Sequence, residues 1–481
     1  MLSVIPDRSL DELGRAEGGP DTLALLVRDQ DTRRLLLLRV LLDAADAAEP
    51  AVCSAAQKTR LREDWALLAE TEAAVRAGPG PAGAADRPAT APARDRILYP
   101  LAGPWALRCL RCLDRTGGPP GPDGARELRL ALAHFSALAT VVATRAGIPF
   151  HARLTAHDGI LVLPSLGSLH TARPGDVPVE VAATDGRLTL RQHGESDVVV
   201  FLESGFGAWS GALAWTPAHA LPGLTPEAAP MPLDDLDPYR AGPEPLHPTQ
   251  SGPTTLDDAG RKRWLQAWSG TAAALRTGGE HRLTEALALL RCLVPLEMPP
   301  GAEGRGGCSA TRREAFGALF SSTPPSPVAF AATLVHELQH AKLAALSDAL
   351  VLHQDDGQPR YFAPWRPDPR PYDGLLQGAY AHLALADFFQ RRALTVAAHR
   401  ESAWSQHSRY RAQVGAVLPA LVGSPQLTVA GRRFVDQMVA AHERMAAHPA
   451  PRGHTVRAEA YLEAARTLWR QRQASATRPN E

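Results

Sequence analysis

The chain has 481 residues, in which 51 lysines and arginines balance 51 aspartates and glutamates. A single hydrophobic core stops growing at about 250–300 residues, so this length predicts two or three packed units. Balanced charge without a long run of one sign argues against a dedicated nucleic-acid surface and against a surface for anionic membranes.

The N-terminus, MLSVIPDRSLDELGR, has acidic residues and a proline where a signal peptide needs an apolar stretch. No stretch approaches the roughly 20 apolar residues of a membrane span. The five cysteines are odd in number and scattered, which suits a reducing compartment. Cys109 and Cys112 form a Cys-x-x-Cys, but a zinc site would need a second pair or a nearby histidine, so we interpret them as core thiols. We therefore expect a soluble, cytoplasmic protein.

The first predicted unit, residues 1–147, is a helical scaffold. Residues 20–76 carry leucines at helical spacing, and a helix rich in alanine and leucine is predicted over residues 125–146. Residues 78–95 are rich in proline, alanine and glycine, a composition that does not pack into a core. We expect this segment to be a flexible surface loop.

The second predicted unit, residues 148–253, has short alternating patterns such as GILVLPSLGSL, VPVEVAATDGRLTLRQ and DVVVFLE. Asp185-Gly186 is typical of a hairpin turn, so we expect a small antiparallel β unit followed by a proline-rich connection. Within that connection, LDDLDPYR has three acids in four positions but lacks the spacing of a calcium loop. We interpret it as a turn or a helix cap.

The third predicted unit, residues 254–481, returns to helical spacing, so the fold class expected for the chain is α+β and mostly α-helical. REAFGALFSST is expected to contain a strand beside the next helix. That helix, around LVHELQHAKL, has two histidines four residues apart, His336 and His340, with Glu337 between them. Residues four apart share one face of a helix, so both imidazoles can bind one metal ion. The structural alternative is a pair of hydrogen-bonded core histidines.

A third ligand would decide the chemistry of such a metal site. A further helix is predicted over residues 374–392, and it lacks a glutamate, the usual third ligand of one large group of zinc peptidases. His382 lies on the apolar face of this helix and is the best candidate ligand. Asp373 and Asp387 are the alternatives.

Between the two helices, YFAPWRPDPRP holds two arginines, Arg366 and Arg370, on a segment stiffened by four prolines. Guanidinium groups bind carboxylates through two parallel hydrogen bonds, so this segment suits an anion close to the metal. The alternative is a pair of solvent-facing arginines in a proline-rich turn.

The combination of LVHELQHAKL, APWRPDPRP and GLLQGAYAHLALADFF, preceded by LDDLDPYR, resembles a bacterial family of HExxH-motif peptide-modification proteins. The resemblance covers most of the chain. It implies an iron(II)- and 2-oxoglutarate-dependent oxygenase that uses O₂ to hydroxylate the β-carbon of a residue in a ribosomally made precursor peptide. Members are often encoded with a radical S-adenosylmethionine maturase, which is therefore a candidate partner.

Under this resemblance, His336, His340 and His382 supply three iron ligands. Arg366 or Arg370 binds the distal carboxylate of 2-oxoglutarate. Glu337 then orients a ligand instead of acting as a base. From the residues alone, two other functions stay open: a zinc metallopeptidase with Glu337 as general base, and a non-catalytic protein that binds a precursor peptide.

Overall fold

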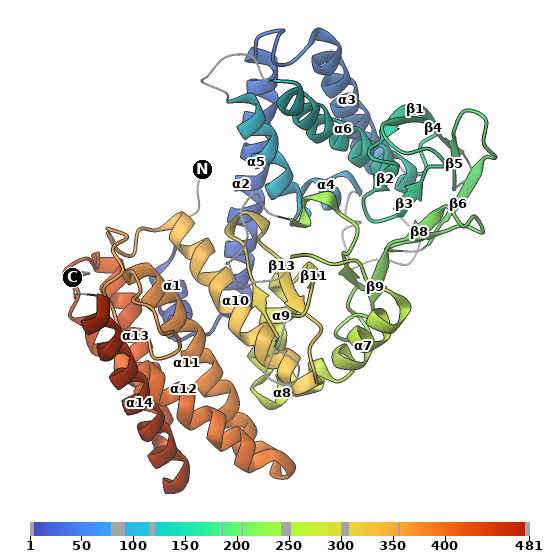
Figure 1. Ribbon diagram of the computed structural model, residues 1–481. Coiled ribbons are helices and arrows are strands. Elements are labelled where there is room, and N and C mark those ends of the chain that lie inside the picture. The colour runs from blue at the N-terminus through green and yellow to red at the C-terminus, as the bar shows by residue number, and fades with distance from the viewer. Residues whose placement is uncertain are drawn as a thin grey trace.

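The computed structural model contains 58% helix and 15% strand, which confirms the predicted α+β, mostly helical fold (Figure 1). Helices dominate both ends of the chain, and most strands lie in its middle. The residues that the structure describes are 4–77, 92–114, 121–184, 186–203, 205–241, 252–299, 307–354 and 356–476.

The N-terminal region is helical in its described part, as predicted. Its helices are α1 (Asp7–Gly14), α2 (Pro20–Ala47), α3 (Ala55–Ala77), α4 (Pro92–Ile97), α5 (Ala102–Leu113) and α6 (Pro122–Arg145). Helix α6 confirms the helix predicted over residues 125–146 and begins earlier because Pro122 fits a first turn, where no N–H partner is needed. The predicted loop 78–95 lies outside the described residues, except that residues 92–95 begin α4.

Helix α6 connects two hydrophobic cores. Among the described residues, it is the one helix that is long and apolar enough to cross a membrane, but 78% of its apolar window is buried inside the protein. Phe135 packs with the neighbouring helices, and Val141 packs against the strands that follow. Cys109 and Cys112 lie in the helical core without a disulfide, as predicted.

Two antiparallel sheets form the predicted β unit. Their strand orders are β1-β4-β5-β6-β7 and β2-β3-β8. The strands are β1 (Phe150–Ala156), β2 (Ile160–Leu163), β3 (Gly167–His170), β4 (Val177–Thr184), β5 (Arg187–Arg191), β6 (Val198–Leu202), β7 (Ala208–Trp209) and β8 (Trp215–Pro217). Gly186, between β4 and β5, has a φ of 72°, the left-handed conformation that a tight hairpin turn needs. This confirms the predicted hairpin.

A third sheet, which was predicted only in part, mixes parallel and antiparallel pairs in the order β12-β13-β11-β10-β9. Its strands are β9 (His219–Leu221), β10 (Met231–Leu233), β11 (Cys292–Leu296), β12 (Ser309–Ala310) and β13 (Ala318–Ser322). Strand β13 confirms the strand expected within REAFGALFSST. Within the described residues, β12 is an edge strand and lies next to the helix that carries the two histidines.

The LDDLDPYR segment is a capped turn, as predicted. The Asp237 carboxylate accepts the N–H of Tyr239 at 2.8 Å and caps the short 3-10 helix η1 (Pro238–Arg240). Asp234 and Asp235 also accept backbone N–H groups, at 3.0 and 2.9 Å. All three buried carboxylates therefore hold the local backbone.

The C-terminal half is built from long helices around the largest core (Figure 1). They are α7 (Asp258–Trp268), α8 (Thr271–Thr277), α9 (Glu280–Leu289), α10 (Pro327–Ala349), α11 (Tyr372–Thr395), α12 (Arg400–Val422), α13 (Val429–Arg444) and α14 (Arg452–Ala476). Leu10, Leu13 and Leu23 of α1 and α2 pack in this same core. The beginning of the chain therefore stabilises the region that carries the candidate chemistry.

Candidate functional site

Helix α10 carries the two histidines of the motif. It begins after Ser326, whose hydroxyl accepts the N–H of Ala329 at 3.2 Å and caps the first turn. The rings of His336 and His340 lie at 81° to each other, and their Nε2 atoms are 3.1 Å apart. Two nitrogens bound to one ion at about 2.1 Å, with a near-right angle between them, are about 3 Å apart. The pair therefore has the spacing of two ligands of one metal ion.

The surroundings of the His336 ring favour a neutral imidazole. Burial and the neighbouring rings of His340 and His382 lower the pKa of His336 well below its usual range. The Nδ1 atom of His340 lies 3.1 Å from Oε1 of Gln377 on α11, so Nδ1 donates to this oxygen and Nε2 is the nitrogen that faces His336. A neutral imidazole with a free lone pair is the form that binds a metal.

His382 lies behind the pair, on α11. Its ring centroid is 5.6 Å from that of His336, and it packs edge-on against Trp365 and beside Tyr410. Burial lowers the pKa of His382 to about 3, and its Nδ1 atom is buried without a hydrogen-bond partner. An unsatisfied buried nitrogen is costly, so this ring has one donor atom that the surrounding protein leaves unused.

The two alternative third ligands lie in different surroundings. Asp387 is bound by Arg282 at 3.3 Å and by Arg391 at 2.9 Å, so its carboxylate is used in ion pairs. Asp373 lies 3.3 Å from His353 and lines the same cavity as the histidine pair. Among the described residues, no three His, Cys, Asp or Glu side chains are already arranged around one point as metal ligands. The residues thus fit a metal with two ligands in place and a third imidazole packed against them.

The side chain of Glu337 is held by strand β12 and the residue that follows it. Its Oε1 atom accepts the hydroxyl of Ser309 at 2.7 Å, and Thr311 also hydrogen-bonds to the carboxyl group. Burial raises the pKa of Glu337, although His340 and these hydrogen bonds oppose the shift. The carboxyl group is therefore fixed between the helix and the edge strand. Its anchors were not predicted because β12 is too short to give a sequence pattern.

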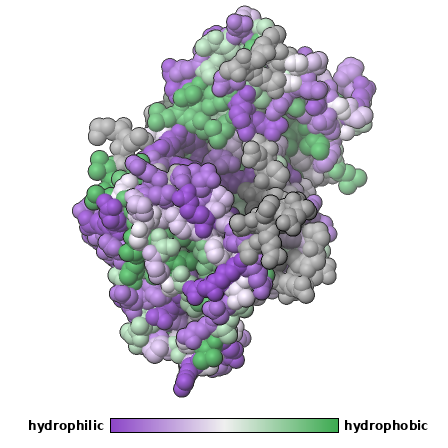
Figure 2. Space-filling view, turned by 60° about the vertical axis from the view of Figure 1, so that its left-hand side comes forward, coloured by the Kyte–Doolittle hydropathy of each residue, from purple (hydrophilic) through white to green (hydrophobic). Residues whose placement is uncertain are grey.

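A cavity of about 570 Å³ brings most of the predicted site together. It is lined by His336, Glu337, His340, Arg366 and Arg370 but not by His382. The space-filling view shows a hollow with hydrophilic walls on this side of the molecule (Figure 2). Paired imidazoles and guanidinium groups therefore face one enclosed volume, although they come from separate parts of the sequence.

The two predicted arginines share one carboxylate. Arg366 Nε lies 3.2 Å from Asp368, and Arg370 Nη1 lies 3.5 Å from the same side chain. Each arginine side chain keeps about a third of its surface exposed, at 33% and 30%. One aspartate cannot neutralise two guanidinium groups, so this segment carries excess positive charge at the cavity wall.

Sequence reasoning missed a third arginine in the cavity wall, Arg312. It is only 8% exposed, its guanidinium lies 4.6 Å from the ring centroid of Phe320, and its Nε and Nη1 atoms are buried without hydrogen-bond partners. Burial lowers the pKa of Arg312, but an arginine stays charged in proteins. Its neighbour Arg313 also lines the cavity but is bound to Asp348. Arg312 therefore lines the space beside the histidines, and two of its guanidinium nitrogens are buried in the protein without a hydrogen-bond partner.

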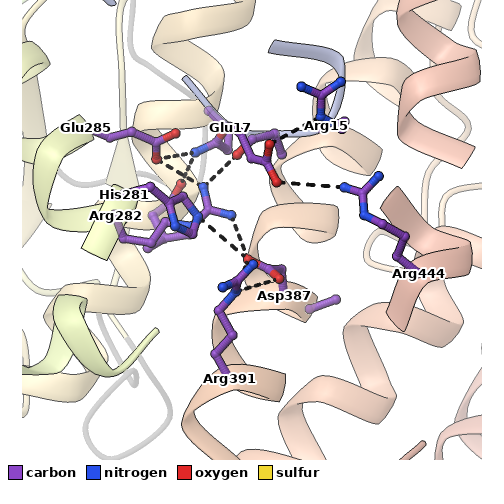
Figure 3. Close-up of polar contacts among 12 residues, drawn as sticks. Arg15, Glu17, His281, Arg282, Glu285, Asp387, Arg391 and Arg444 are labelled. Atoms are coloured by element: carbon purple, nitrogen blue, oxygen red, sulfur yellow. Dashed lines mark hydrogen bonds and ion pairs between the residues drawn. The ribbon is translucent and has the colours of Figure 1, made fainter. Parts of the chain in front are cut away.

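A buried network of charges lies behind the histidine helix (Figure 3). Glu285 of α9 accepts hydrogen bonds from Lys342 of α10 at 2.5 Å and from Arg282 at 3.0 Å. Arg282 also pairs with Asp387 of α11 at 3.3 Å. The side chains of Lys342, Glu285 and Arg282 are at most 1% exposed. The network ties three helices together, two of which carry the candidate ligands.

Comparison with protein-family models and with curated proteins finds no match to this chain.

Proposed function

We propose that this protein is an iron(II)- and 2-oxoglutarate-dependent oxygenase that hydroxylates the β-carbon of a residue in a precursor peptide. One observation carries the proposal: the histidine pair lines the same cavity as three arginines, Arg312, Arg366 and Arg370. A 2-oxoglutarate enzyme needs a cation to bind the distal carboxylate of its cosubstrate.

In this proposal, His336 and His340 hold the iron, and His382 is the third ligand. Iron(II) with O₂ supplies the oxidation of 2-oxoglutarate to succinate and CO₂ and the transfer of one oxygen atom to the peptide. Gln377 orients His340 through the hydrogen bond to Nδ1. His382 has a buried nitrogen without a partner, and its ring already packs against His336.

The arginines hold the cosubstrate. Arg312 is the strongest candidate because it lines the cavity and, within the described residues, has no aspartate at ion-pair distance as Arg366 and Arg370 do. A charge-assisted hydrogen bond is about twice as strong as a neutral one. Arg366 and Arg370, the residues predicted from the sequence, lie on the same cavity wall and share Asp368. A volume of about 570 Å³ is sufficient for a dicarboxylate together with one peptide side chain.

Glu337 is a positioning residue in this proposal. Its carboxyl group is fixed by Ser309 and Thr311 and lies beside His336 in the chain. A carboxyl group held in this way restricts the face of α10 that borders the cavity and excludes solvent from it. Its loss should reduce iron affinity and leave the type of reaction unchanged.

A zinc metallopeptidase is the second candidate, because Glu337 lines the cavity together with both histidines, as a general base would. In that case the arginines would bind the terminal carboxylate of a peptide. The two functions make opposite demands on the metal and on 2-oxoglutarate, so a single assay separates them.

The test is succinate formation from 2-oxoglutarate by the metal-free protein after addition of iron(II) or of zinc(II). We expect turnover with iron(II) alone, and we expect Arg312→Ala to require more 2-oxoglutarate. Arg187→Ala is the matched control, because Arg187 is exposed on β5 away from the cavity. Mass spectrometry of a precursor peptide encoded nearby should show one added oxygen atom. Peptide cleavage with zinc(II) and no effect of 2-oxoglutarate would instead establish the peptidase.

A further inference from the structure

A second cavity, of about 790 Å³, lies in the N-terminal part of the molecule. Its walls come from helices α3 and α6, from strands β1 and β2, and from the turn η1. No described residue lines both this cavity and the one beside the histidines. The chemistry proposed above therefore makes no use of it.

The inner wall of this second cavity is apolar. Leu61 of α3, Leu132 of α6 and Leu154 of β1 are at most 5% exposed and line it. Ile160, at the start of β2, lines the same space and is 41% exposed. Burying an exposed aliphatic side chain in a complex removes its apolar surface from water, which favours binding. The cavity can therefore accept apolar side chains of a partner.

Positive charge surrounds this apolar wall. Five arginines and two acids line the cavity, namely Arg60, Arg108, Arg129, Arg153, Arg240, Glu127 and Asp235. Both acids are already engaged, because Glu127 pairs with Arg108 at 3.0 Å and Asp235 accepts a backbone N–H. Arg60 and Arg129 also pair with carboxylates, Asp64 at 3.2 Å and Asp176 at 3.6 Å, so the excess positive charge at this cavity comes from Arg153 and Arg240.

Arg240, the last residue of LDDLDPYR, is the clearest example of such a cationic group. Its guanidinium donates to the carbonyl oxygen of Asp237 at 2.8 Å and to the hydroxyl of Thr255 at 3.4 Å, and neither acceptor is charged. Its Nε atom is buried without a hydrogen-bond partner. The capped turn that Asp237 stabilises therefore fixes an arginine at the cavity with donor capacity remaining.

We propose that this second cavity binds an acidic segment of the substrate peptide that also carries apolar side chains. The proposal rests on the proposed function, in which the substrate is a peptide whose reacting residue occupies the first cavity. Arginine clusters that recognise acidic motifs and apolar walls that take anchoring side chains are recurrent modes of peptide binding. A segment held here keeps the rest of the same chain at high effective concentration near the histidines.

The test is a fluorescence anisotropy titration of the full-length protein with a short fluorescein-labelled peptide of leucine and glutamate. EDTA is present and 2-oxoglutarate is absent, so binding is measured independently of any turnover. The same titration uses peptides in which lysine replaces glutamate or serine replaces leucine. The variant is Arg153→Glu combined with Arg240→Glu, and Arg187→Glu on β5 is the control of equal charge change.

We expect the leucine–glutamate peptide to bind and to lose affinity with added salt. We expect both altered peptides to bind the unaltered protein at least about tenfold more weakly than the leucine–glutamate peptide does. We expect the double variant to bind the leucine–glutamate peptide at least about tenfold more weakly as well, while Arg187→Glu binds it as the unaltered protein does. Equal binding of the glutamate and lysine peptides would overturn the proposal, as would normal affinity of the double variant. Two other occupants would overturn it too. One is a fatty acid, shown by binding of dodecanoate at this cavity without any peptide binding; the other is a second copy of the chain, shown by dimer formation that the double variant abolishes.

Two outcomes separate this proposal from the proposed function. Arginine-dependent peptide binding without 2-oxoglutarate turnover would leave the docking site standing and remove the oxygenase. Turnover of 2-oxoglutarate together with peptide binding that is insensitive to the double variant would support the oxygenase and remove the docking site.

Discussion

Glu285→Gln is the substitution that most directly tests the buried network behind the histidine helix. In the native protein, the Glu285 carboxylate balances two buried cations, Lys342 at 2.5 Å and Arg282 at 3.0 Å. Glutamine keeps the shape of the side chain but removes its charge. Of the two cations, only Arg282 would then keep a carboxylate partner, Asp387, which is 22% exposed and also binds Arg391. Removing one partner of a buried ion pair destabilises a protein by about 3–5 kcal/mol, and we expect a loss of that size.

Lys342→Met provides the comparison, because it removes a cation instead of the carboxylate. Glu285 keeps Arg282 as its partner, and methionine fills a similar volume with apolar atoms. The loss is then closer to that of one charge-assisted hydrogen bond, about 1.5–3 kcal/mol. We measure both variants by urea unfolding followed by far-UV circular dichroism. Two results would refute this reasoning: Lys342→Met is the more destabilised of the two variants, or Glu285→Gln unfolds at the same urea concentration as the native protein.

The pH dependence gives an independent check of the same charge. Burial raises the pKa of Glu285, but Lys342 and Arg282 outweigh burial and lower it to about 2. A carboxyl group whose pKa is lowered by folding contributes stability that is fully present above its unfolded pKa, about 4.3, and is lost as the pH falls toward the folded pKa. The difference in unfolding free energy between the native protein and Glu285→Gln should therefore be constant above about pH 5 and shrink toward pH 2. A difference that grows on acidification would contradict this.

Four further predictions concern the site. His336→Ala and His340→Ala should each remove iron, measured as bound metal per chain by atomic absorption, while far-UV circular dichroism stays native. His382→Ala should also lose iron; normal iron content would make Asp373 the better third ligand. Arg312→Ala should keep iron but raise the 2-oxoglutarate concentration for half-maximal succinate formation by about one to two decades, because a charge-assisted contact is worth about 1.5–3 kcal/mol. Glu337→Gln should bind iron more weakly without producing peptide cleavage.

The parts of the fold that depend on local pattern were predictable from the sequence. The helices around Leu132 and His336, the hairpin at Gly186 and the capped turn at Asp237 follow from spacing and from turn residues within a few positions. The third sheet was predicted only at β13. Strands β9, β10 and β12 have only two or three residues, and β11 is buried along its whole length, so none of them shows an alternating pattern.

The same distinction applies to the site. His336 and His340 could be paired from the sequence because one turn of helix fixes their separation. Arg366 and Arg370 could be placed near them because they lie between the two helices, just before the start of α11. Arg312 could not, since nothing in its own neighbourhood shows that its guanidinium is buried and left with unsatisfied donors. That property arises when β12, β13 and α10 pack together and exclude water.

The relation between His382 and the histidine pair depends on how α11 lies against α10, and the buried charges contribute to that arrangement. Lys342 is on the same helix as His336 and His340, and Asp387 is on the same helix as His382. Glu285 and Arg282 of α9 join these two side chains through contacts of 2.5 to 3.3 Å. A charge network is more directional than apolar packing, because each donor has to keep its acceptor. It therefore restricts sliding of α11 along α10, which would move a third ligand away from the first two.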